Sequence, residues 1–170
     1  MGQRLAIATA ASIVTLGIAA CGEGDGGDTA TTATTTPISK QQFVRDANKI
    51  CSSSDDKIER ASNEFFAGAP RGEGPPPEEI EQFGKKTVFP TIQAEIDRIE
   101  ALGAPEGDED EVNEILESAQ AGLDELEENP ERLAKGGSTT AFEEAEKLAA
   151  DYGLDQCGWA PASVLVRAPH

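Results

Sequence analysis

The chain has 170 residues with 32 acidic and 14 basic side chains, which give a net charge of −18 at pH 7. This charge excludes nucleic acid as a partner, because the phosphate backbone selects basic surfaces. It also argues against a protein that lies flat on anionic lipid. Residues 39–158, 120 in number, are long enough for one hydrophobic core and not for two.

Residues 1–20 have the three parts of a secretory signal peptide. Arg4 supplies the positive start, residues 5–20 are uncharged and mostly apolar, and the segment ends in Ile18-Ala19-Ala20-Cys21. An aliphatic residue, two small residues and cysteine form a lipobox, so we expect cleavage between Ala20 and Cys21 and a lipid on the Cys21 thiol. The alternatives are an uncleaved membrane anchor, for which the apolar stretch is short, and a secretory signal that is cut at another site.

Residues 21–38 are predicted to be a lipidated flexible tether, because glycine, acidic residues, threonine and alanine cannot build a core. Gly22, Gly24 and Gly27 match the glycine spacing of dinucleotide-binding loops. That motif needs a strand before it and a helix after it, and here it follows a cleavage site among acidic residues. We therefore interpret the match as chance.

The next segment predicts a helix at 40–66, which begins with the capping-box pair Ser39 and Gln42. Residues spaced three or four apart predict its core face: Phe43, Ala47, Ile50, Cys51, Ser54, Ile58, Ala61 and Phe65. A second helix is predicted at 78–102, with an apolar stripe made of Ile80, Phe83, Ile92, Ile96, Ile99 and Leu102. Gly84 and Pro90 interrupt it, so it is either kinked or two helices.

Two more helices are predicted, at 109–128 and 140–152. The first has the core stripe Val112, Ile115, Leu116, Ala119, Leu123 and Leu126. The second begins with a capping box of Thr140 and Glu143 and ends at Gly153 and Leu154 in a Schellman motif. The fold class predicted for residues 39–158 is all-α, a small up-down bundle of about four helices, and residues 159–170 form a tail without an assigned structure.

Three cysteines are present, and lipidation uses Cys21. Two cysteines, Cys51 and Cys157, then remain. An even number of cysteines outside the cytoplasm predicts a disulfide between them. Two free thiols and an intermolecular disulfide are the alternatives.

Two motifs resemble those of a known family. F-V-x-x-A-N-x-I-C spans Phe43 to Cys51, and Y-G-L-x-x-C-G spans Tyr152 to Gly158. With the segment Phe89 to Ile96, they resemble uncharacterised small helical lipoproteins and secreted proteins of actinobacteria and their relatives, over roughly residues 40–158. The resemblance implies a helical fold and a Cys51–Cys157 disulfide, and it implies no activity. The chain after Gly158 is longer than the family's pattern.

The sequence gives no catalytic or cofactor-binding residues and no metal ligands to name. The one histidine is His170, at the end of the chain, and a triad needs a base beside its nucleophile. The acidic run at 108–111, with Asn113 and Glu114, lacks a calcium loop and fits the charge preference of a helix start. Lys85 and Lys86, like the group Glu95, Asp97 and Arg98, are interpreted as solvated faces.

These observations predict a lipoprotein on the extracytoplasmic face of the cell membrane, held by a lipid on Cys21. We expect a non-enzymatic interaction module that docks an envelope protein or the cell wall. The alternative is a lipoprotein that holds a small molecule or a cation between helices, for which the interruption at Pro90 would supply a gap.

Overall fold

The computed structural model describes residues 37–68, 74–135 and 139–159. Within these ranges the chain is helical and has no strand. The elements are α1 (Lys40–Ala67), α2 (Pro77–Phe83), the π-helical turn η1 (Gly84–Val88), α3 (Phe89–Glu100), α4 (Glu109–Glu128), α5 (Glu131–Ala134), the 3-10 turn η2 (Thr139–Ala141) and α6 (Glu143–Tyr152). The predicted signal peptide, Cys21, the tether before residue 37 and His170 lie outside the described residues.

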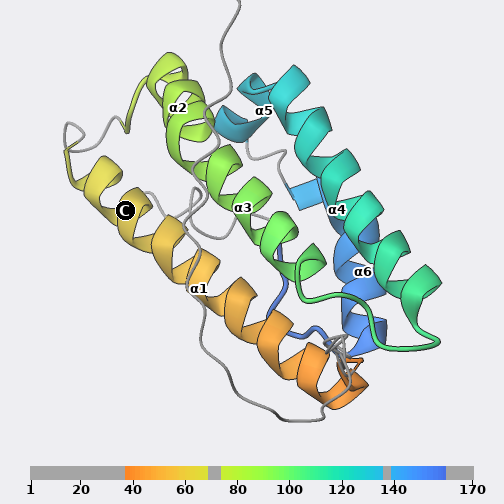
Figure 1. The fold of residues 1–170 in the computed structure, drawn as a ribbon. Helices are drawn as coiled ribbons and strands as arrows, with labels where there is room; N and C mark the ends of the chain where they lie inside the picture. The colour runs from red at the N-terminus through yellow and green to blue at the C-terminus, as the bar shows by residue number, and fades with distance from the viewer. Residues whose placement is uncertain (1–36, 69–73, 136–138, 160–170) are drawn as a thin grey trace, which may run out of the picture. The chain divides into compact units, whose positions relative to one another are not determined.

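The helices form an up-down bundle, as the sequence predicts (Figure 1). α1 packs on α3, α3 on α4, and α4 on α6, while the short α5 packs on α2. Successive long helices run in opposite directions because the loops between them are short. The end of α6 therefore returns to the first half of α1, which is where both predicted disulfide partners lie.

α1 begins as predicted, since the Ser39 hydroxyl accepts a hydrogen bond from the Gln42 backbone N–H at 3.3 Å. The reciprocal half of the capping box is not formed, because the Gln42 side chain donates instead to Asp46. The predicted core face is correct from Phe43 to Ile58. Beyond it the buried residue is Ser62, while the predicted Phe65 is only half-buried.

The predicted second helix is one rod with a widened turn. η1 separates α2 from α3, and the Phe89 N–H bonds to the Gly84 carbonyl, five residues back. A proline crowds the carbonyl four residues before it, which for Pro90 is that of Lys86, and the wide turn relieves this conflict. The interruption is packed rather than open: a Cβ on Gly84 would lie 2.3 Å from the Leu133 side chain of α5.

α4 has the predicted bounds and the predicted buried stripe. The capping box predicted at Thr140 and Glu143 is wrong. Thr140 lies in η2, where its hydroxyl accepts from Arg132, and α6 begins at Glu143 without a side-chain cap. The cause is tertiary, because Phe142 is fully buried and fixes where the chain enters the helix.

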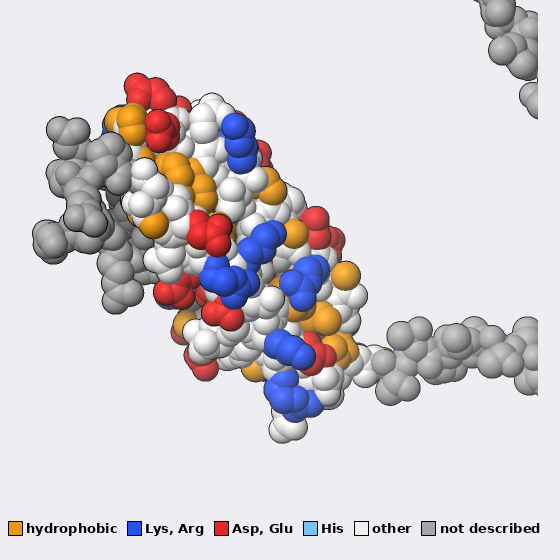
Figure 2. Space-filling model, turned by 90° about the vertical axis from the view of Figure 1, so that its left-hand side faces the viewer, with side chains coloured by type: hydrophobic (Ala, Val, Ile, Leu, Met, Phe, Trp, Pro, Cys, Tyr) orange, Lys and Arg blue, Asp and Glu red, His pale blue; other side chains and the backbone are white. Residues whose placement is uncertain are grey.

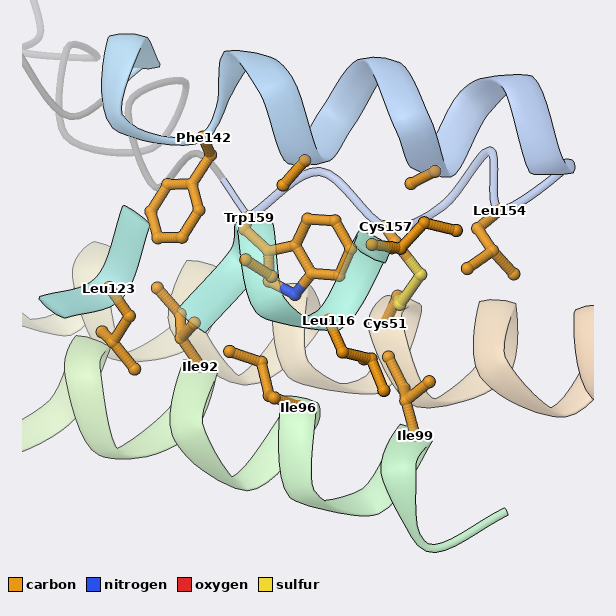
Figure 3. Close-up of a cluster of buried hydrophobic side chains, with 14 of the residues drawn as sticks. Cys51, Ile92, Ile96, Ile99, Leu116, Leu123, Phe142, Leu154, Cys157 and Trp159 are labelled. Atoms are coloured by element: carbon orange, nitrogen blue, oxygen red, sulfur yellow. A yellow bond between two sulfur atoms is a disulfide. The ribbon is translucent and has the colours of Figure 1, made fainter. Parts of the chain in front are cut away.

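The Schellman ending of α6 is confirmed. Gly153 has φ 103°, and the Leu154 N–H bonds to the Ala149 carbonyl at 2.8 Å. The chain then returns to the core, where Trp159 is 3 % exposed among side chains of α3 and α4 (Figure 3). Assigning Trp159 to the tail was therefore wrong, since the large ring fills space between the helices. Residues 160–170 lie outside the described residues.

Candidate functional site

The structure joins Cys51, on the inner face of α1, to Cys157, after α6, in an intramolecular disulfide with its Cα atoms 5.0 Å apart (Figure 3). Both residues are buried. Asn48, one turn before Cys51, holds the partner segment in place. Its side chain donates to the Gly153 carbonyl at 3.1 Å and accepts from the Gln156 N–H at 2.8 Å. The asparagine of the N-terminal motif thus positions the second cysteine.

Glu95 of α3 is buried, at 3 % exposure, so interpreting it as part of a solvated face was wrong. Its neighbours in that group, Asp97 and Arg98, are exposed as predicted, and so are Lys85 and Lys86. The signal was present in the spacing: Glu95 comes three residues after Ile92 and four before Ile99, which places it on the core side of the helix.

The environment of Glu95 favours its neutral form. Burial raises the pKa of the Glu95 carboxyl from 4.5 to about 8. A side-chain hydrogen bond with Ser54 acts against this shift, the nearby Asp55 carboxylate adds to it, and Arg98 opposes it weakly. A carboxylic acid held neutral inside a protein is a proton donor and, once deprotonated, a ligand or a base.

Three groups from different elements converge at this place. One carboxylate oxygen of Glu95 and the Sγ atoms of Cys51 and Cys157 all lie within 4.8 Å of one another. Ser54, the polar residue in the apolar stripe of α1, forms a side-chain hydrogen bond with the carboxyl group. The sequence predicts the two cysteines as a pair, and folding brings the carboxyl group to them. We define Cys51, Ser54, Glu95 and Cys157 as the buried cluster.

A second polar group lies at the start of α1. Tyr152 donates a hydrogen bond to Asp108 at 2.8 Å, and the Lys40 ammonium lies 3.4 Å from the same carboxylate and 3.8 Å from the centre of the Tyr152 ring. Desolvation and the Asp108 carboxylate raise the pKa of Tyr152. An open pocket of about 450 Å³ adjoins it, between residues 37–40 and 105–108.

The charges of the bundle are unevenly distributed. The face shown in Figure 2, on the side of α1, mixes Lys and Arg with acidic and apolar side chains. α4 has no basic residue. Its exposed acidic side chains are Glu109, Asp110, Glu111, Glu114, Glu117, Asp124, Glu125, Glu127 and Glu128. Those of the first turn lie where the helix dipole favours negative charge, as predicted. The rest form an acidic face along the whole helix.

No family model, curated protein or solved structure matches the chain. The resemblance to actinobacterial lipoproteins thus stays a prediction from two motifs. Among residues 37–68, 74–135 and 139–159, no helix is both long and apolar enough to cross a membrane. The predicted lipidation of Cys21 and cleavage after Ala20 also stay predictions.

Proposed function

We propose that the chain is a lipid-anchored protein of the extracytoplasmic membrane face whose bundle is a non-enzymatic interaction module of the cell envelope. The observation that carries the location is the intramolecular Cys51–Cys157 disulfide, because such bonds persist in oxidising compartments and are rare in the cytoplasm. The lipobox at Cys21 supports the anchor. Removal of residues 1–20 takes away Arg4 and no acidic residue, so the net charge moves from −18 to −19.

The uneven charge supports the role as an interaction module. The charged side chains of α4 are all acidic, and only Glu111 and Glu125 among them pair with basic side chains of the described residues, those of Lys40 and Arg132. Such a face is repelled by anionic lipid headgroups and attracts a cationic surface on a partner. The composition of residues 22–37 predicts a tether, and a flexible coil of 16 residues spans on the order of 20–25 Å, which would give the bundle reach. We therefore expect the α4 face to contact a basic patch on another envelope component.

The anchor is tested by fractionation of cells that express the chain with Cys21→Ala. The variant is expected in the soluble extracytoplasmic fraction, because acyl chains contribute about 0.8 kcal/mol per buried CH₂ to membrane binding. Thr32→Ala, a matched change in the tether, should leave the protein in the membrane fraction. A Cys21→Ala protein that stays with the membrane would contradict the lipid anchor.

The interaction is tested by crosslinking in intact cells, followed by identification of the crosslinked protein. One variant neutralises α4 with Glu114→Gln, Glu117→Gln and Asp124→Asn, and a control removes the same charge from α1 with Asp56→Asn, Glu59→Gln and Glu64→Gln. We expect a specific crosslink that the α4 variant loses and the control keeps. No specific crosslink in the wild type, or equal loss in both variants, would count against an interaction through α4.

The alternative function, binding of a small molecule or cation, has one feature in its favour. The open pocket beside Lys40 and Asp108 offers opposite charges at a concave surface. The interrupted stretch from Gly84 to Pro90 gives it no support, because Leu133 packs against Gly84. A thermal-shift screen of the oxidised protein against metabolites and metal ions separates the two functions. A shift that Lys40→Met abolishes favours this alternative, and the absence of any shift removes it.

A further inference from the structure

The buried cluster combines two sulfur atoms with a carboxyl group that forms no salt bridge with any residue of 37–68, 74–135 and 139–159. Cys51, Cys157 and Glu95 are 1 %, 3 % and 3 % exposed, and their ligand atoms lie within 4.8 Å of one another. Arg98, the basic residue that acts on Glu95, is itself exposed. Burial of a carboxyl group beside apolar helices opposes folding unless the group has a partner. The Ser54 hydroxyl supplies one hydrogen bond, and one carboxylate oxygen of Glu95 lies within 4.8 Å of both sulfur atoms.

We propose that reduction of the Cys51–Cys157 disulfide converts this cluster into a buried binding site for a thiophilic divalent cation such as Zn²⁺, with both cysteine sulfurs and a Glu95 oxygen as ligands. Thiolates with a carboxylate are a ligand set that zinc accepts. In the oxidised protein the two sulfurs bond to each other and cannot serve as thiolate ligands. The site therefore exists in one redox state only.

The reaction balances with a dithiol as reductant. The dithiol gives up two electrons and becomes a disulfide, while Cys51 and Cys157 each take up one electron and one proton and become thiols. The cation then displaces the two thiol protons and the proton of the Glu95 carboxyl. A divalent ion with three anionic ligands leaves a net charge of −1 inside the bundle.

The geometry requires only small movements. Zinc lies about 2.3 Å from sulfur and about 2.0–2.2 Å from carboxylate oxygen, so ligand atoms around one ion are roughly 3.5–4 Å apart. After reduction the two sulfurs separate, and the carboxylate oxygen moves inward from at most 4.8 Å. Cys157 can adjust because it lies outside any helix, between Gly153 and Gly158. Ser54 holds the carboxyl group as an outer-shell hydrogen bond does in metal sites.

The test uses the full chain with Cys21→Ser, so that Cys51 and Cys157 are the remaining cysteines. The disulfide is reduced with a phosphine, which becomes the phosphine oxide and contributes no thiol. Co²⁺ is the probe, because thiolate ligands give it a sulfur-to-metal charge-transfer absorption, and Zn²⁺ is then used to displace it. We expect one Co²⁺ per reduced chain and none in the oxidised chain.

Two matched variants distinguish Co²⁺ binding by the whole cluster from Co²⁺ binding by the two cysteine thiols alone. Glu95→Gln keeps the size of the side chain and removes the anionic ligand, so the dissociation constant for Co²⁺ should rise about 10-fold or more. Glu100→Gln, an exposed change on the same helix, should leave it unchanged. Circular dichroism follows whether the reduced chain stays helical. An absent charge-transfer band in the reduced wild type, or equal affinity in Glu95→Gln, overturns the proposal. If the reduced chain is unfolded and binds Co²⁺ through its thiols alone, Glu95→Gln will bind with the same affinity as wild type, and this result also overturns the proposal.

Discussion

The α1–α3 interface and the α4–α6 interface are built in different ways. Apart from the indole N–H of Trp159, which follows α6, and the Tyr152 hydroxyl, the buried polar and charged side chains among the described residues lie on α1 and α3. They are Ser54, Ser62, Thr91 and Glu95. The buried residues of α4 and α6 are apolar or glycine, apart from the Tyr152 hydroxyl, which bonds to Asp108. Each interface is an antiparallel pair with a continuous stripe. The difference shows that periodicity places a residue inside the bundle and does not fix its polarity.

The two interfaces also differ in how closely they pack. On α4, Gly122 faces the end of η2 and the residue that caps α6: an added Cβ would lie 2.4 Å from the Ala141 carbonyl oxygen and 2.7 Å from the Phe142 ring. On α1, Ser62 has a buried hydroxyl with no hydrogen-bond partner among the described residues. The α4–α6 interface thus derives stability from fit, while the α1–α3 interface tolerates polar groups that lower it. The disulfide joins the second helix pair to the first.

Removal of the disulfide should have the largest effect on stability. Cys51 and Cys157 are 106 residues apart, and the chain-entropy relation gives about 4–5 kcal/mol of stabilisation for a loop of that size. We expect the double variant Cys51→Ala/Cys157→Ala to lose about that free energy of unfolding in urea titrations. Phosphine-treated wild type is the control and should show a similar loss. A loss below about 1 kcal/mol would mean that helix packing alone holds the two pairs together.

Glu95 should make the stability of the polar interface depend on pH. Its pKa is raised in the folded protein, from 4.5 to about 8, so the folded state holds the proton more tightly than the unfolded chain does. The stabilisation is complete below the unfolded pKa and is lost as the pH rises through the folded pKa. We expect this group to lower the free energy of unfolding by about 2 kcal/mol between pH 6 and pH 8.

The matching measurement is a series of urea titrations of wild type and Glu95→Gln over that pH range. The variant should lose this decline, because glutamine does not titrate. Glu100→Gln should keep it. If Glu95→Gln shows the same slope as wild type, Glu95 is ionised in the folded protein, and the contrast between a neutral polar interface and an apolar one fails.

The close fit of α4 and α6 is tested by Gly122→Ala. Overpacking costs about 1–3 kcal/mol, and the higher helix propensity of alanine returns about 1 kcal/mol. We therefore expect a net loss of about 1 kcal/mol in the free energy of unfolding. Ala121→Gly, at the adjacent exposed position, measures the propensity difference without the contact. A stabilised Gly122→Ala protein would show that the interface has room for a methyl group.

The smallest effect is expected at Ser62, and its sign is opposite. Ser62→Ala removes a buried hydroxyl without a partner among the described residues, which should raise the free energy of unfolding by about 0.5–1 kcal/mol. Ser53→Ala, on the exposed side of α1, changes the helix propensity alone. Equal effects in thermal melts would mean that the Ser62 hydroxyl has a hydrogen-bond partner, and that this residue does not lower the stability of the α1–α3 interface.

Much of the fold followed from local sequence. The bounds of α4, the start of α1 at Ser39 and the αL ending at Gly153 were predicted correctly, because each depends on neighbours a few residues away. The start of α6 was predicted incorrectly, because burial of the Phe142 side chain decides where the helix begins and the local capping pattern at Thr140 does not. α5 has four residues, too few for a periodic pattern, so no sequence signal predicts it.

The sequence by itself determined the helical class, the apolar stripes and the two cysteines available for pairing, since these depend on residue type and spacing along one helix. Only the tertiary structure decided that the Glu95 carboxyl lies beside the Cys51–Cys157 sulfurs, that Trp159 belongs to the core, and that Leu133 packs against Gly84. The physical reason is that each of these results depends on contacts between segments far apart in the chain. A pattern read along one helix holds no information about which side chain the next helix places against it.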